Sequence, residues 1–204
     1  MWNLVHDTKV SITQWQQTEI NRLDPEEVRS THKKYLATAN RLKATFADMK
    51  GTKAPESVAR IKQKELSDFT NKIPIIRCLC TEGLKKNHIE EMSKVLRLDP
   101  KIDCTQQNIL YLPDDAPQQI QKLDEIADFA SKQFSNENQL KNMVKDWEPL
   151  RFDTKEWKGV SHILDGEAVE VLSTTLDDHI IRTQTMRGSP YIEPFKEELF
   201  AWED

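Results

Sequence analysis

An uninterrupted helical period from residue 117 to residue 147 constrains the fold more than any other feature of this 204-residue sequence. Its apolar positions recur at steps of three or four, apart from one longer step across Glu137: Leu123, Ala127, Ala130, Phe134, Leu140, Val144 and Trp147. This spacing places one apolar stripe on a helix that would be roughly 45 Å long at about 1.5 Å per residue. A helix of this length predicts a strut and not a core helix of a small globule.

Shorter helical segments precede the strut. Residues 2–19 predict a first helix, in which we expect Trp2 and Trp15 to lie in the core. Asp24-Pro25 predicts the start of the next helix, because Asp caps a helix N-terminus and Pro fits its first turn. The apolar seam that follows is typical of an antiparallel or coiled-coil-like pair, and it contains Val28, Tyr35, Ala39, Leu42 and Phe46. The sequence therefore predicts paired helices.

Two further helices are expected before the strut. One begins near Pro55, carries Val58, Ile61, Leu66 and Phe69 on one stripe, and is interrupted by Pro74. A second follows a capping box predicted at Asn87–Glu90. The apolar residues around Pro74 predict a buried corner.

The stretch from Gly159 to Phe195 predicts a joint between helical pieces. Residues 151–164 alternate apolar and polar around Lys158-Gly159, which predicts a β-hairpin. A helix should then follow the turn at Asp165-Gly166 and end near Gly188, with its apolar stripe formed by Val169, Leu172, Leu176 and Ile180. A last helix is expected over residues 193–204.

These patterns predict a mainly α fold of elongated antiparallel helical bundles with one small β-hairpin. We place a boundary at an acidic, proline-marked loop over residues 113–117. Residues 1–112 would form an N-terminal helical bundle, and residues 113–204 the strut helix, the hairpin and the helices after it. Neither terminal helical pattern has a cap, so both ends are interpreted as cuts through a longer chain.

Composition restricts the possible functions. The net charge of −5 argues against sequence-independent binding of nucleic acid, which needs a basic surface. No apolar run approaches a membrane span, and the N-terminus lacks the apolar stretch of a signal peptide. Three cysteines without a staple-like spacing indicate a reducing compartment. We therefore expect an intracellular protein that contacts neither nucleic acid nor membrane.

Two groups of residues could suggest metal chemistry. Cys78, Cys80 and Cys104 with His88 could form a zinc site, but neighbours two apart on a helix point about 200° apart. The cysteines are therefore expected to be buried small apolar residues. Asp177-Asp178-His179 could serve a metal-dependent hydrolase, yet on a helix these three side chains diverge, and Asp178 can pair with Arg182.

No phosphate-binding glycine loop occurs in the sequence. We therefore expect no catalytic residue, no metal and no cofactor. The tryptophans remain as candidates for contacts: Trp147 lies on the strut seam and is expected in the core. Trp157 near the hairpin tip and Trp202 in the last helix are candidates to meet another domain.

Several segments resemble dynein heavy chains. The apolar-Pro-apolar run over residues 66–79, the helix from Ile126 to Trp147, and the run Leu176-Asp177-Asp178-His179-Ile180 each match that family. The similarity continues through Thr183-Gln184-Thr185-Met186 and Ser189-Pro190-Tyr191 to residues 195–202, and it is closer to axonemal than to cytoplasmic heavy chains. It covers most of the chain, and it is most specific after residue 160.

The resemblance implies the N-terminal part of the dynein linker, a non-catalytic arm that swings over the AAA+ ring of the same heavy chain as ATP is hydrolysed there. The implied partners are the ring, the dynein tail and, through the whole motor, microtubules in the axoneme of a cilium or flagellum. Candidate inter-domain contacts are Trp157, His162, Tyr191, Phe195 and Trp202. A hinge is expected over residues 148–190. The alternative is a spectrin-like helical scaffold.

Overall fold

The computed structural model describes residues 1–49, 51–99, 101–113 and 116–203. Residues 114 and 115 of the expected boundary loop, and Asp204, lie outside the described residues. Two compact units are present, Met1–Ala130 and Ser131–Asp204, and the division falls inside one helix. The boundary predicted at residue 113 stays a prediction about the parent protein.

Unit 1 is helical because its segments carry apolar stripes at helical spacing, and the start of α2 has a strong signal. Asp24 caps α2 by accepting hydrogen bonds from the amides of Glu26 and Glu27, as predicted. The elements of unit 1 are α1 (Trp2–Gln17), η1 (Ile20–Arg22), α2 (Pro25–Asp48), α3 (Lys53–Thr70), α4 (Ile73–Leu79), α5 (Lys86–Val95), η2 (Ile109–Tyr111), η3 (Ala116–Gln119) and the first part of α6 (Ile120–Trp147).

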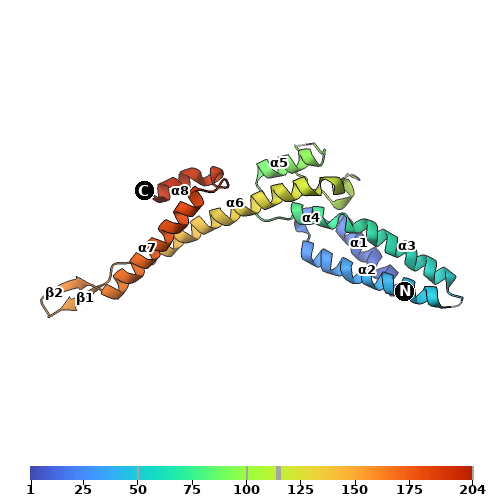
Figure 1. Cartoon of the computed structure of the whole chain (residues 1–204), viewed down its shortest axis with the longest axis horizontal. Coiled ribbons are helices and arrows are strands. Elements are labelled where there is room, and N and C mark those ends of the chain that lie inside the picture. The colour runs from blue at the N-terminus through green and yellow to red at the C-terminus, as the bar shows by residue number, and fades with distance from the viewer. Residues whose placement is uncertain (50, 100, 114–115, 204) are drawn as a thin grey trace. The chain divides into compact units, whose positions relative to one another are not determined.

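Helices α2 and α3 form the antiparallel pair that the seam predicts (Figure 1). Ala39 of α2 and Leu66 of α3 are both fully buried and belong to one apolar cluster. A buried hydrogen bond of 2.7 Å joins His32 Nε2 in α2 to the carbonyl oxygen of Leu66 in α3. The pair is therefore held by apolar contact and by one buried polar contact.

The core of unit 1 lies where α4 meets α2 and the first part of α6. Ile75 and Ile76 are fully buried there, which confirms the corner expected around Pro74. The amide of Ile20 donates to the carbonyl of Gln107, and Arg77 of α4 pairs with Asp124 of α6. These contacts bind the loop between α5 and α6 into the same core.

Three predictions for unit 1 are wrong. Ile61, expected on the apolar stripe of α3, is 56 % exposed, and Ala59 is buried instead. Trp2 is 72 % exposed, whereas Trp15 is buried, because Trp2 lies about 140° round the helix from Trp15 at 100° per residue. The capping box predicted at Asn87–Glu90 is displaced. Helix α5 begins at Lys86, and the Lys85 amide donates to His88 Nδ1 at 3.1 Å, so His88 performs the capping.

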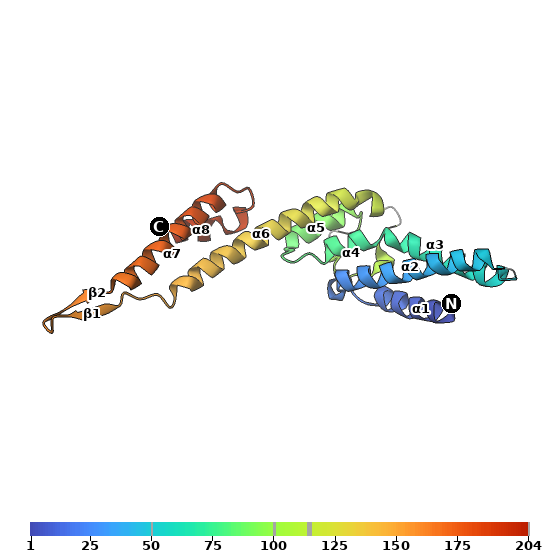
Figure 2. The same cartoon turned by 60° about the horizontal axis from the view of Figure 1, so that its bottom comes forward.

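Unit 2 contains the rest of α6, strands β1 (Thr154–Trp157) and β2 (Ser161–Leu164), α7 (Gly166–Arg187), η4 (Glu193–Phe195) and α8 (Lys196–Glu203). Helix α8 returns alongside α7 (Figure 2). Their shared core with α6 contains Leu140, Met143, Met186, Ile192, Phe195 and Leu199. Gly188 caps α7 at the predicted position.

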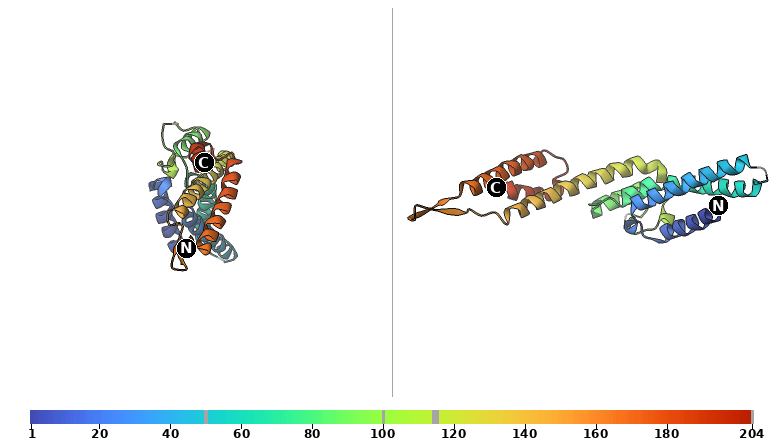
Figure 3. Two further views of the ribbon diagram at one scale, coloured as in Figure 1. Left: turned by 90° about the vertical axis from the view of Figure 1, so that its left-hand side faces the viewer. Right: turned by 90° about the horizontal axis from the view of Figure 1, so that it is seen from below.

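The strands form the expected antiparallel hairpin, the one sheet among the described residues, with Trp157 opposite Ser161. Lys158 and Gly159 both have positive φ, 54° and 68°, as a tight turn that matches strand twist requires. Every residue of both strands is exposed, and no other element of unit 2 lies beside them (Figure 3). The hairpin therefore contributes no core.

Within the described part of the chain, no helix combines the length and the apolar character needed to span a membrane.

A pair of substitutions on α3 tests the seam. Leu66→Ala should lower the free energy of unfolding by about 2 to 5 kcal/mol, because Leu66 is fully buried between two helices. Ile61→Ala on the same helix should change it by less than about 0.5 kcal/mol, because Ile61 is 56 % exposed. Urea unfolding followed by circular dichroism measures both, and equal effects would contradict this packing.

Candidate functional site

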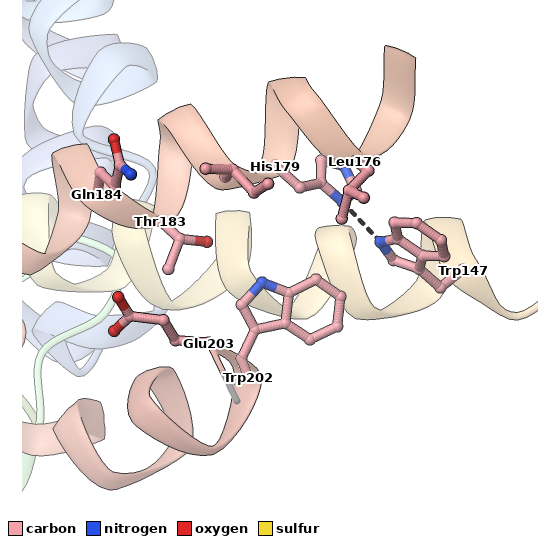
Figure 4. Close-up of a pocket in the computed structure, with 8 residues that line it drawn as sticks. Trp147, Leu176, His179, Thr183, Gln184, Trp202 and Glu203 are labelled. Atoms are coloured by element: carbon pink, nitrogen blue, oxygen red, sulfur yellow. Dashed lines mark hydrogen bonds between the residues drawn. The ribbon is translucent and has the colours of Figure 1, made fainter. Parts of the chain in front are cut away.

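A pocket of about 250 Å³ in unit 2 is lined by residues at the end of α6, along α7 and at the end of α8. Figure 4 shows Trp147 of α6 and Trp202 of α8 on either side of it, with His179 and Thr183 of α7 above. Trp202 packs against the core of unit 2, and both indoles are only partly covered. The pocket is therefore aromatic and open to solvent.

Each ring nitrogen of His179 lies near a polar group at the pocket. The indole N–H of Trp147 donates to its Nδ1 at 2.8 Å (Figure 4), so the proton of the neutral imidazole lies on Nε2. Nε2 lies 3.6 Å from the carboxylate oxygen Oδ2 of Asp146. The His179 side chain is buried, which fixes the Trp147 ring relative to α7.

The enzyme-like run Asp177-Asp178-His179 does not converge. Asp178 accepts from Arg182 one turn along α7 at 2.8 Å, as predicted, while Asp177 is exposed. His179 points away from both into the pocket. Among the described residues, no group of three or more His, Cys, Asp or Glu side chains is placed to hold a metal ion.

The apolar stripe predicted for α7 is partly wrong. Leu172 is buried, but Leu176 and Ile180 are exposed to 48 % and 44 %. The buried face instead follows Leu172, His179, Thr183 and Met186. Leu176 and Ile180 lie at the edge of that face and line the pocket, because no described side chain of unit 2 fills the space beside them.

The hairpin carries two of the predicted contact residues, Trp157 and His162, and both are exposed. Lys155 of β1 donates to Asp165 Oδ1 at 2.7 Å, and Asp165 also caps α7 by accepting from the amide of Glu167. The hydrogen bond from Lys155 lowers the pKa of Asp165 below its ordinary value, with a further contribution from the Glu167 amide. The hairpin is thereby tied to the first turn of α7.

The other three predicted contact residues occupy different environments. Phe195 is buried in the core of unit 2, and Tyr191 is half-buried with Lys132 Nζ 5.5 Å from its ring centre. Trp202 lines the pocket, with its ring centre 6.1 Å from that of His179. The structure brings Trp202 together with Trp147 and His179, and it leaves Trp157 and His162 apart on the hairpin.

Sequence reasoning missed the pocket itself. It placed Trp147 in the core and expected the side chains of Asp177, Asp178 and His179 to diverge, and it did not join Trp147 to His179. The available signal was a row of polar residues at helical spacing, because His179 lies four residues after Thr175 and four before Thr183. That signal could not identify the partner on α6.

The cysteines are placed as predicted for small buried residues, with Cys80 less buried than the other two. Each thiol lies near a different acceptor: Asp124 for Cys78, the Ile20 carbonyl for Cys80 and the Ile89 carbonyl for Cys104. Burial raises the pKa of Cys78 and of Cys80 to about 11. Both are therefore protonated thiols at neutral pH and poor nucleophiles.

The sequence as a whole matches one family. A sequence model described as "Dynein heavy chain, N-terminal region 2" matches residues 1–204. The chain belongs to the dynein heavy chain family. This membership replaces the spectrin-like alternative.

Axonemal members of the family are similar to this chain. Human dynein axonemal heavy chain 3 is 27 % identical over 205 residues, which cover 100 % of this chain and 5 % of the relative. Human dynein axonemal heavy chain 1 is 26 % identical over 207 residues, again 100 % and 5 %. Rat dynein axonemal heavy chain 12 is 34 % identical over 124 residues, covering 59 % of this chain and 4 % of the relative.

The chain thus spans about a twentieth of the length of the relatives that it matches end to end. It is homologous to the N-terminal region of axonemal dynein heavy chains.

The ion pair between Lys155 of the hairpin and Asp165 should make the stability of the protein depend on pH. Because the folded pKa of Asp165 is lowered, its contribution to stability is present above the unfolded pKa and is lost as pH falls through the folded pKa. Lys155→Met should raise the pKa of Asp165 towards its ordinary value of 3.8. Carbon-13 NMR titration of the carboxyl measures it, with Lys158→Met as the control in the same hairpin. An unchanged pKa in Lys155→Met would contradict the tie.

The hydrogen bond inside the pocket can be tested by Trp147→Phe. This change leaves His179 Nδ1 without its donor and should lower the free energy of unfolding by about 1 to 3 kcal/mol. Trp157→Phe on the exposed hairpin is the matched control and should change it by less than about 0.5 kcal/mol. Urea unfolding measures both. A Trp147→Phe protein as stable as the control would show that the bond does not hold α6 to α7.

Proposed function

We propose that this chain is the tail-proximal part of the linker of an axonemal dynein heavy chain, the helical arm that swings over the AAA+ ring. ATP would be hydrolysed in the ring, and this region would transmit force without catalysing a reaction. Its partners would be the ring of the same heavy chain, the dynein tail and, through the whole motor, microtubules. It would act in the axoneme of a cilium or flagellum.

The observation that carries the proposal is the match of the whole sequence to an N-terminal region of dynein heavy chains. Axonemal relatives that match across the full chain support the axonemal assignment. Membership of this family also supports an ATPase as the parent protein. The mechanical role is our inference from these findings together with the helices.

The helices suit a part that carries load. Helix α6 is 28 residues long and contributes to the cores of both units. Its last turn is bonded to α7 through Trp147 and His179, and the hairpin is bonded to α7 through Lys155 and Asp165. Force applied to α7 would therefore pass into α6 through packed and hydrogen-bonded side chains.

We propose that Trp157, His162, Tyr191 and Trp202 contact other domains of the motor. Phe195 would support that surface from the core beneath it. The exposed apolar side chains of the hairpin suit such a contact, because a two-stranded hairpin alone has little stability in water. A hinge over residues 148–190 belongs to the same proposal, and superposition of both flanking helical blocks in two nucleotide states would exclude it.

A substitution in α6 of the whole heavy chain tests the mechanical role. Ser135 is an exposed residue inside α6. Ser135→Pro removes one helical hydrogen bond and kinks or breaks the helix, so microtubule gliding should slow at least about fivefold while basal ATP hydrolysis stays within about twofold. Ser135→Ala preserves the helix and should glide normally. Gliding assays and phosphate release measure the two properties.

Two results would contradict the mechanical role. Normal gliding with Ser135→Pro would mean that an intact α6 is not needed to transmit force. Loss of ATP hydrolysis together with gliding would mean that this region takes part in the reaction of the ring.

A further inference from the structure

The pocket in unit 2 has the composition of a site for a cation. Its walls are two indoles, two aliphatic side chains and four polar side chains, and its single charged lining residue is the acidic Glu203. Asp146 adds a second carboxylate beside the buried imidazole of His179. Aromatic faces together with negative charge attract a cation more strongly than an anion or a neutral group.

Several polar groups of the pocket have no partner among the described residues. They are the indole N–H of Trp202, the hydroxyl of Thr183, the side-chain amide of Gln184 and Oε2 of Glu203. Three of these groups offer oxygen acceptors. A purely apolar occupant would cover them without providing hydrogen bonds, which costs free energy.

An internal ion pair shows that Glu203 accepts a guanidinium. Arg187 Nη1 donates to Glu203 Oε1 at 2.8 Å, and the Arg187 guanidinium lies 5.7 Å from the ring centre of Phe200. This pairing uses one oxygen of the carboxylate and stands at the edge of the pocket. The other oxygen is left for a second donor.

We propose that the pocket binds an arginine side chain presented by another part of the same heavy chain. A planar guanidinium can lie against the faces of Trp147 and Trp202, and its five N–H donors can meet the acceptors of Thr183, Gln184 and Glu203. A pocket of about 250 Å³ accommodates one such side chain and not a helix. Lysine fits less well because its compact ammonium cannot stack.

The inference that the arginine belongs to the same heavy chain rests on the proposed function. Relatives that match this chain end to end are about twenty times longer, so most of a heavy chain would be tethered to this region. Tethering gives a segment an effective concentration that reaches the millimolar range for short flexible linkers. A single side chain with an intrinsic Kd near that range would then occupy the pocket for much of the time.

The first experiment titrates the 204-residue protein with N-acetyl-L-arginine methylamide and follows indole N–H signals by nitrogen-15 NMR. The five tryptophans give separate signals, so the protein contains its own controls. The signals of Trp147 and Trp202 should shift with a Kd on the order of 1 mM. Those of Trp2, Trp15 and Trp157 should shift far less.

Two analogues of the arginine probe test whether its charge contributes to binding. The citrulline analogue has nearly the shape of arginine without the charge, and the leucine analogue is apolar. Each should bind at least about tenfold more weakly if charge and stacking both contribute. Equal binding of citrulline or of leucine, or no saturable shift with arginine, overturns the proposal.

Substitution of two glutamates on α8 tests which carboxylate attracts the arginine. Glu203→Gln should weaken arginine binding about fivefold, as loss of one exposed ion pair predicts. Glu197→Gln, on the exposed face of the same helix, should leave it unchanged. Trp202→Leu should abolish the shift of the Trp147 signal. Equal binding by the two glutamine variants overturns the role of Glu203.

A second experiment tests the source in the whole heavy chain. A photoreactive benzoylphenylalanine replaces Gln184 at the pocket, with Glu197 replaced in a control protein, and mass spectrometry identifies the cross-linked peptides. We expect an arginine-containing peptide of the same chain from the Gln184 position. A peptide of a separate protein, or none, overturns the intramolecular source. The titration of the 204-residue protein fails or succeeds independently of the gliding test of the proposed function.

Discussion

The structure depends on the narrowness of its apolar stripes. Charged residues make up 31 % of the chain and apolar residues 37 %, so each helix has one face to bury and cannot form a core alone. Pairing is the physical solution, as α2 and α3 show with Leu66 and Ala39 between them. The buried hydrogen bond between His32 and the Leu66 carbonyl is directional, unlike the apolar contacts around it. Pairing of this kind yields bundles held along their seams.

In unit 2 the apolar faces of the helices are only partly buried. Met143, Met186 and Leu199 close a small core, but Leu176 and Ile180 lie at the edge of the buried face of α7 and stay exposed. At that point the bond between Trp147 and His179 replaces apolar packing and keeps α6 beside α7. The uncovered remainder is the pocket with Trp202 on its other side. A region that acts by contacting other domains would need surfaces of this kind, and the exposed hairpin is a second one.

The family membership and the helical fold are both consistent with the role that we propose. The chain matches an N-terminal region of dynein heavy chains over its whole length, and the mechanical role that we propose would use its long helix α6. Its three cysteines lie near separate acceptors. In the enzyme-like Asp177-Asp178-His179 run, Asp178 forms an ion pair, His179 accepts a part-buried hydrogen bond and Asp177 is exposed. Apart from Asp177, these residues thus have structural partners. The proposed arginine site would give the pocket a role in docking.

The sequence by itself determined the helices, the start of one at Asp24, the interruption at Pro74, the hairpin turn at Lys158-Gly159 and the resemblance to the family. These features depend on local rules, since capping, proline geometry and positive φ involve residues that are near each other in the chain. The exposure of Trp2 and the cap at His88 are local features as well, but only the tertiary structure decided that Leu176 and Ile180 border a pocket. A periodic stripe shows which face is apolar, but it does not show how much of that face the partner helices cover. The meeting of Trp147, His179 and Trp202 depends on three helices at once, and no local pattern encodes it.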